Sequence, residues 1–355
     1  MPGLKDLLAE TAYRLGWTVI CRLPEGLARL GFTAAAEIAW RRQGHGVQVL
    51  EANLLRVLGP GTSGKQLRAV SRAAMRSYAR YWLEVFRLPV IGTGDLLARM
   101  RVTGEAETAI AEAAAGRPVI FALPHTGNWD VAGAYFIARG VPFTTVQERL
   151  KPEPVYDMFV AFRERLGMEV LPLTGGPGAF GVLARRLRSG RAVCLLCDRD
   201  LTESGVEVEF FGEKARMAAG PAALAVRTGA PLRPVILWFT EDGWVAHVRK
   251  PIPVPAEGDR ATKAAVMTQR LADAFAEGIA EHPEDWHMLQ RVFTADLGPA
   301  RLPPAVPGAG SGEGTPGARG AQDGQDGQGA RGAQDGQGGP GARADDGGPA
   351  AERDG

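Results

Sequence analysis

The chain has 355 residues, of which 45% are hydrophobic and 23% are charged, and this composition is typical of a globular protein with one large core or two modest ones. A net charge of +1 gives no reason to expect a nucleic-acid ligand. Residues 301–355 carry five arginines against eight acidic residues, so the remainder of the chain is mildly basic, which suits an anionic membrane or a phosphorylated ligand.

The first hundred residues predict helices, because apolar side chains recur at helical spacing over residues 4–19, 27–38 and 70–82. Trp17, Trp40 and Trp82 stand in these segments, with arginines close by in the sequence. Two interpretations stay open: a helical layer packed on a sheet, or an interfacial cap with aromatic and cationic side chains at the level of lipid headgroups. No window approaches ~18 uncharged apolar residues and no secretory signal is visible, so we expect a peripheral protein on the cytoplasmic face of the membrane.

From residue 101 to 300, strands and helices alternate, and we expect an α/β fold with a mostly parallel central sheet flanked by helices. Most of the strands are continuous apolar runs, as expected when both faces of a sheet are covered. The predicted strands are 118–123, 142–147, 168–173, 191–197 and 231–239, and the predicted helices are 105–115, 127–139, 152–166, 178–189, 218–228 and 263–280. Residues 1–300 form one predicted domain, and the glycine-rich segment 301–355 is predicted to be a disordered tail.

The three cysteines, Cys21, Cys194 and Cys197, are too few and too unevenly placed for a disulfide framework, and they favour a reducing compartment. Cys194 and Cys197 have the spacing of a redox or zinc pair. They lie in an apolar run that predicts a buried strand, and no second Cys or His pair follows at a ligand spacing. We therefore predict no metal site.

Chemistry is concentrated at His125, which follows the predicted strand 118–123 after Pro124. Catalytic groups in open α/β sheets gather at the carboxyl ends of strands. Asp130 lies five residues later, close enough to orient the imidazole, so that His125 could act as a general base. The alternative is that His125 and Asp130 only cap and complement a helix start.

A competing motif is Gly176, Gly178 and Gly181, which fits G-x-G-x-x-G between a predicted strand and a helix. Asp198, at the end of the next strand, stands near the position of the acid that binds ribose in dinucleotide folds. The motif therefore supports an alternative function, an NAD(P)-dependent oxidoreductase. A strand-to-helix turn near a donor phosphate explains the same glycines.

The six residues at 125–130, His-Thr-Gly-Asn-Trp-Asp, resemble the H-x4-D block of the glycerolipid acyltransferase superfamily. Their H-x-x-N-W-D form is similar to the branch that acylates bacterial glycolipids: the lipid A late acyltransferases and the actinobacterial phosphatidylinositol mannoside acyltransferases. The similarity extends from about residue 4 to about residue 295. Its later blocks look most like the mannoside branch: ERLKP at 148–152, FRERLG at 162–167, DRDLT at 198–202, VEFFG at 208–212 and WHMLQ at 286–290.

This resemblance implies transfer of a fatty acyl group from acyl-CoA to the 6-hydroxyl of a mannose on a phosphatidylinositol mannoside. It implies His125 as the base, Asp130 as its partner and Arg163 as a residue that binds a phosphate or holds the site together. Asp198 stands where this branch often has Glu, as a site carboxylate. A lipid A-type acceptor and a non-catalytic membrane scaffold are the alternatives within this resemblance.

Weaker substrate-binding candidates are Arg199, Glu148, Arg149 and His287, the first three because they follow predicted strands. Arg199 and Asp198 could also be only an ion pair at a strand end, and His282 and His287 could be ordinary histidines near the end of the domain. The expected partners are acyl-CoA, a mannosylated phosphatidylinositol and the membrane surface. We expect no bound cofactor and a monomer.

Overall fold

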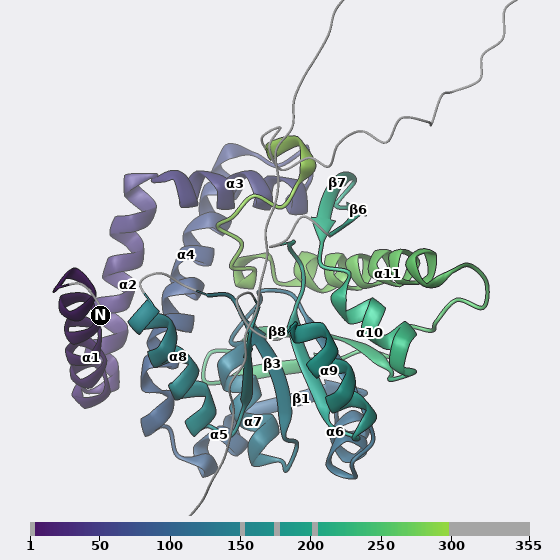
Figure 1. Ribbon diagram of the computed structural model, residues 1–355. Helices are drawn as coiled ribbons and strands as arrows, with labels where there is room; N and C mark the ends of the chain where they lie inside the picture. Colours follow the sequence, from purple (N-terminus) through teal and green to yellow (C-terminus); the bar gives the residue numbers. More distant parts are fainter. Residues whose placement is uncertain (1–3, 150–152, 174–177, 201–204, 298–355) are drawn as a thin grey trace, which may run out of the picture. The chain divides into compact units, whose positions relative to one another are not determined.

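The computed structural model describes residues 4–149, 153–173, 178–200 and 205–297 (Figure 1). All of the described residues belong to one compact unit. The predicted disordered tail, residues 301–355, lies outside the described residues.

The N-terminal part of the chain is helical, as predicted. It contains α1 (Leu4–Arg22), α2 (Glu25–Arg42), α3 (His45–Leu58), α4 (Gly64–Arg87), the short 3₁₀ helix η1 (Leu88–Val90) and α5 (Thr93–Arg99). Ser63 caps α4 by accepting a hydrogen bond from the main-chain N–H of Gln66. Figure 1 shows α1 and α2 on the outer side of α4, away from the sheet. In the part of the chain that the structure describes, no helix is both long enough and apolar enough to cross a membrane.

The central sheet has seven strands in the order β1-β9-β8-β2-β5-β3-β4. The strands are β1 (Met100–Gly104), β2 (Ile120–Leu123), β3 (Phe143–Gln147), β4 (Glu169–Pro172), β5 (Ala192–Leu196), β8 (Leu232–Phe239) and β9 (Trp244–Val248). Within this sheet, neighbours pair in parallel except for β8 and β9. The prediction of a mostly parallel sheet is confirmed, although β1 and β9 were not predicted.

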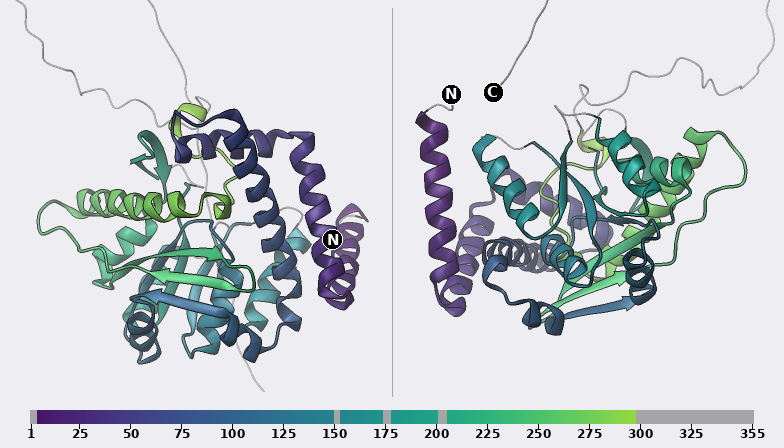
Figure 2. Two further views of the ribbon diagram at one scale, coloured as in Figure 1. Left: turned by 180° about the vertical axis from the view of Figure 1, so that it is seen from behind. Right: turned by 60° about the horizontal axis from the view of Figure 1, so that its bottom comes forward.

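Helices cover both faces of the sheet, which explains the continuous apolar runs (Figures 1 and 2). Along β2, Phe121 and Leu123 join the core under α4, α6 (Ala106–Ala114), α7 (Trp129–Ala138) and α8 (Glu153–Arg165). Ile120 and Ala122 join the opposite core under α9 (Ala179–Arg188), α10 (Gly220–Thr228) and α11 (Arg260–Glu281). Because both faces of the sheet are covered by apolar cores, we expect polar functional side chains at the ends of the strands.

An antiparallel hairpin of β6 (Val206–Phe210) and β7 (Glu213–Met217) was not predicted. Its turn, Phe211-Gly212, has φ values of 51° and 77°, the two positive angles of a type I′ turn. The short 3₁₀ helices η2 (Pro283–Asp285) and η3 (Thr294–Asp296) follow α11. The C-terminal segment that contains them passes the carboxyl end of β2, where Trp286 forms an antiparallel bridge with Thr126.

Candidate active site

His125 lies beside Asp198, at the carboxyl ends of two neighbouring strands. Leu123 of β2 pairs in register with Leu196 of β5, and each of the two polar residues follows two positions later. The register therefore carries both side chains to the same edge, and Asp198 Oδ1 lies 2.5 Å from His125 Nδ1. The edge-to-face contact of the His125 ring with Trp129, at 5.4 Å between centroids, packs the imidazole from another side.

The Asp198 carboxylate is fully buried and accepts hydrogen bonds from three groups. Its Oδ2 accepts from the main-chain N–H of His125 and from the indole N–H of Trp286, each at 2.9 Å. Burial alone would raise the pKa of Asp198, but the facing imidazole and these donors lower it below its usual value. An ionised carboxylate on Nδ1 keeps the proton on that nitrogen, which leaves the lone pair of His125 Nε2 free to accept a proton.

The expectation that Asp130 orients His125 is wrong in its geometry. Asp130 Oδ1 accepts from Arg163 Nε at 2.6 Å, and Oδ2 accepts from Arg163 Nη2 at 2.9 Å and from the Tyr81 hydroxyl at 3.0 Å. Burial and the adjacent carboxylate raise the pKa of Tyr81, so the phenol stays a donor. Asp130 is in the first turn of α7, and its side chain meets α4 and α8 instead of the end of β5. The contacts of Asp130 with Tyr81 and Arg163 thus connect α7 to α4 and α8.

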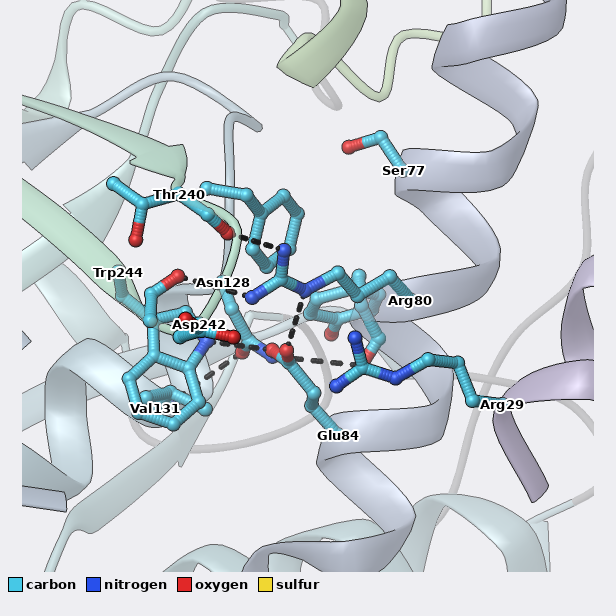
Figure 3. A network of polar contacts seen from close by, with 12 residues as sticks. Arg29, Ser77, Arg80, Glu84, Asn128, Val131, Thr240, Asp242 and Trp244 are labelled. Carbon is cyan, nitrogen blue, oxygen red and sulfur yellow. Dashed lines mark hydrogen bonds and ion pairs between the residues drawn. The ribbon is translucent and has the colours of Figure 1, made fainter. Parts of the chain in front are cut away.

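Asn128 fixes the start of α7 and joins it to α4 (Figure 3). Its Oδ1 caps the helix by accepting from Val131 N, and its Nδ2 donates to Glu84 Oε2 at 2.9 Å. The same buried Oε2 accepts from the indole N–H of Trp244 at 2.7 Å, and Oε1 accepts from Arg80 Nε at 2.7 Å. The asparagine of the predicted motif therefore has a structural role, because its hydrogen bonds and those of Glu84 connect α4, α7 and β9.

The C-terminal segment holds the main chain of the His125 loop. His287 N donates to His125 O at 2.8 Å, and Gly127 N donates to Asp285 O at 3.0 Å. Gly127 has a φ of 53°, and a Cβ there would come within 2.8 Å of the Leu237 carbonyl carbon, so only glycine fits. The loop is thus enclosed between β8 and the segment that follows α11.

The remaining predicted site residues have identified partners. Arg163 is bound to Asp130 and donates from Nη1 to Gln147 Oε1 at 2.6 Å, which favours a role in holding the site together. Arg199 Nη2 lies 3.3 Å from Glu148 Oε2, so an ion pair joins the loops that follow β3 and β5. Arg149 forms an ion pair with Glu153, four residues later in the chain.

An apolar groove lies between the N-terminal helices and α8. Its volume is about 470 Å³, within the ordinary range of ligand pockets. Aromatic rings lead from it to the histidine: Trp82 lies 5.1 Å from Tyr81, and Tyr81 lies 4.2 Å from Trp129, between ring centroids. The lining side chains carry no charge: Tyr13, Phe32, Ala35, Ala36, Ala39, Met75, Tyr78, Ala79, Trp82, Phe86, Val155 and Phe159.

The dinucleotide alternative does not fit this structure. Strands β4 and β5, which flank the glycine motif, are separated in the sheet by β3, whereas a dinucleotide fold needs them adjacent. The Asp198 carboxylate is bonded to His125 and Trp286 and is closed to a ribose. Gly178 precedes α9 and Gly181 lies within it, and Gly176 lies outside the described residues.

The cysteines have no ligand-like arrangement. Cys194 and Cys197 are free thiols, and burial raises the pKa of both. Within residues 4–297, apart from the three internal gaps in the description, no group of three or more His, Cys, Asp or Glu side chains is placed to hold a metal ion.

The sequence was compared with known protein families and with curated proteins. Residues 6–295 match the family described as bacterial lipid A biosynthesis acyltransferase, and the chain belongs to that family. The protein is therefore an acyltransferase, as predicted. The phosphatidylinositol mannoside acyltransferase of Mycobacterium tuberculosis is 48% identical over 296 residues, covering 82% of this chain and 90% of the relative. That of Mycolicibacterium smegmatis is 46% identical over 295 residues, covering 83% and 94%.

Proposed function

We propose that this enzyme transfers a fatty acyl group from acyl-CoA to the mannose 6-hydroxyl of a phosphatidylinositol mannoside. The observation that carries the chemistry is the pair of His125 and Asp198 at the edge of the sheet. The acceptor is inferred from the names of the two mycobacterial relatives. In this proposal the acceptor hydroxyl attacks the thioester carbonyl carbon directly, so no acyl-enzyme forms.

In the proposed mechanism, His125 Nε2 takes the proton of the hydroxyl while its oxygen forms a bond to the thioester carbonyl carbon. Asp198 stabilises the imidazolium that forms. The tetrahedral intermediate collapses as the C–S bond breaks, and the imidazolium returns its proton to the departing thiolate. Proton and leaving group are thus balanced with no metal or bound cofactor.

The apolar groove is the proposed site of the acyl chain. Its uncharged lining suits a hydrocarbon chain, and successive ring contacts link Trp82 of the lining through Tyr81 and Trp129 to His125. Burial of a methylene group contributes about 0.8 kcal/mol, so a long chain would supply most of the donor's affinity.

Helices α1 and α2 are the proposed membrane-facing surface. Leu15, Leu27 and Leu30 are 65%, 59% and 67% exposed, which is unusual for leucine. Arg22 ends α1, and Arg41 and Arg42 end α2, so cations flank the apolar side chains. This combination fits an anionic leaflet at the level of its headgroups.

The test is transfer of radiolabelled palmitate from palmitoyl-CoA to purified phosphatidylinositol mannosides. The wild type and the exposed-histidine control His45→Ala should both be active, and His125→Ala should lose activity. Full activity of His125→Ala would overturn the mechanism. A lipid A precursor offered in the same assay tests the other acceptor, which the family description favours.

A further inference from the structure

A buried polar network lies behind the His125 loop, built from one residue of α4 and two of the C-terminal segment. Ser77 Oγ is 2.5 Å from Asp285 Oδ1 and 2.8 Å from His287 Nε2. The other carboxylate oxygen, Asp285 Oδ2, accepts from the main-chain N–H of Phe239 at 2.8 Å. All three residues are more than nine-tenths buried.

The hydrogens can be assigned by counting donors. Burial raises the pKa of Asp285 to about 6, so at pH 7.5 the carboxylate only accepts. Ser77 has a single hydrogen and gives it to Asp285, so its oxygen accepts from His287 Nε2–H. Burial and the neighbouring His125 lower the pKa of His287 to about 3, so the ring is neutral and its Nδ1 carries a bare lone pair.

This Nδ1 has no hydrogen-bond partner among the described residues, although it is buried. Leaving a buried polar atom unpaired costs about 1–3 kcal/mol, a cost that a binding role explains. Four aromatic rings surround the His287 ring, with centroids 5.5 Å (Tyr78), 5.9 Å (Tyr81), 6.2 Å (Phe239) and 6.3 Å (Trp129) away. Of these, Tyr78 and Trp129 are partly exposed. Tyr78 also lines the groove, and Trp129 contacts His125, so the nitrogen lies one side chain away from the reacting groups.

We propose that Ser77 and Asp285 are positioning residues that fix the tautomer of His287, whose Nδ1 accepts a hydrogen bond from a hydroxyl of the acceptor sugar. The contact forms when Tyr78 or Trp129 turns aside for the sugar. The inference rests on the proposed function for the nature of the acceptor, whereas the tautomer follows from the network alone.

Asp285→Asn tests this hydrogen-bond relay from Asp285 through Ser77 to His287. The substitution keeps the shape of the side chain at 285 and reverses the direction of both hydrogen bonds of Ser77. The Phe239 N–H needs an acceptor, so the Asn oxygen takes that place and the Asn NH₂ faces Ser77. Ser77 must then donate to His287 Nε2, which moves the ring proton to Nδ1. The nitrogen chemical shifts of ¹⁵N-labelled histidine at pH 7.5 distinguish the two tautomers. Asp273→Asn, an exposed site on α11, is the matched control and should leave the tautomer unchanged.

Kinetics test the contact. The KM for the mannoside should rise about tenfold in Asp285→Asn, while the KM for palmitoyl-CoA stays unchanged. His287→Asn keeps a polar atom near Nδ1 and should keep a lower acceptor KM than His287→Gln, which keeps one near Nε2. An unchanged tautomer in Asp285→Asn would overturn the relay. A reversed tautomer with an unchanged acceptor KM would overturn the contact. Absence of mannoside transfer by the wild type would instead overturn the proposed function.

Discussion

Asp198 and His125 are 73 residues apart in the chain, and their side chains meet at 2.5 Å. The contact makes the carboxylate after β5, not the one five residues after the histidine, the partner of the proposed base. The second carboxylate, Asp130, is neutralised by Arg163. The two acids of the site therefore have separate tasks, and substitution can separate them.

Asp198→Asn should lower kcat by about 10³- to 10⁴-fold, in the range known for a buried acid behind a catalytic histidine. Trp286 and the His125 main chain both donate to Oδ2, so the Asn oxygen takes that place and its NH₂ faces His125 Nδ1. The ring proton would then move to Nε2 and block the base. The palmitate-transfer assay measures kcat, with Asp273→Asn as control. A loss of less than tenfold would contradict the assignment.

Asp130→Ala should destabilise the fold by about 3–5 kcal/mol, because it leaves the mostly buried Arg163 without its carboxylate. Urea unfolding of the purified protein measures this free energy. The double variant Asp130→Leu with Arg163→Met removes both charges and should recover much of the loss. If the single variant kept its stability but lost kcat, Asp130 would have a chemical role that its contacts do not indicate.

Ala79→Phe should shift donor preference toward shorter acyl chains, because a ring at this lining position fills part of the groove. The ratio of kcat/KM for palmitoyl-CoA to that for octanoyl-CoA measures the shift, and we expect a fall of about tenfold or more. Leu97→Phe, at an exposed site of α5, should leave the ratio unchanged. An equal fall with both donors would indicate that the chain binds elsewhere.

Leu27→Asp combined with Leu30→Asp should weaken binding to vesicles that contain anionic lipid, because it places two charges on the exposed apolar face of α2. Co-sedimentation with the vesicles measures the bound fraction. Val254→Asp, which adds a charge at an exposed apolar site outside α1 and α2, is the control. Equal binding of the α2 double variant and the Val254→Asp control would exclude this face of α2 from the membrane-facing surface.

Acid should reverse the His287 tautomer in the wild type. The pKa of Asp285 is raised to about 6 by burial and by Glu284, against the opposing effects of Ser77, Phe239 N–H and His282. A raised carboxyl pKa means that the fold favours the neutral form, and the stability from this group is lost as pH rises from its usual 3.8 toward 6. Below about pH 6 the protonated acid donates to Ser77, so the acceptor KM should rise in the wild type but not in Asp285→Asn. Steady-state kinetics between pH 5 and 8 measure this difference.

The parallel part of the fold could be predicted because its strands are buried on both faces and read as unbroken apolar runs. Strands β6 and β7 contain no unbroken apolar run and were missed for that reason, although the alternation Val-Glu-Val-Glu-Phe in β6 is typical of a strand with one exposed face. Strands β1 and β9 are short, at five residues each, and β9 runs against β8. Runs this short give only a weak periodic signal.

The position of the proposed base after β2 could be predicted, whereas its carboxylate partner was predicted incorrectly. The spacing of His125 and Asp130 is local, and it suggested a contact that the first turn of α7 does not make. The contact with Asp198 depends on the register of β2 on β5, which is a tertiary property. Trp286 belongs to the WHMLQ block, but no role was predicted for it from the sequence. No local pattern indicates that its indole N–H donates to Asp198, 88 residues earlier in the chain.

The C-terminal segment completes the site although it is synthesised last among the described residues. His125 emerges from the ribosome long before Trp286 and His287, which complete the hydrogen bonds of Asp198 and of the His125 main chain. Domains generally fold as units, so we expect the site to be completed only after this segment has left the ribosome. A chain that stops before residue 286 would then carry every strand of the sheet and no working active site.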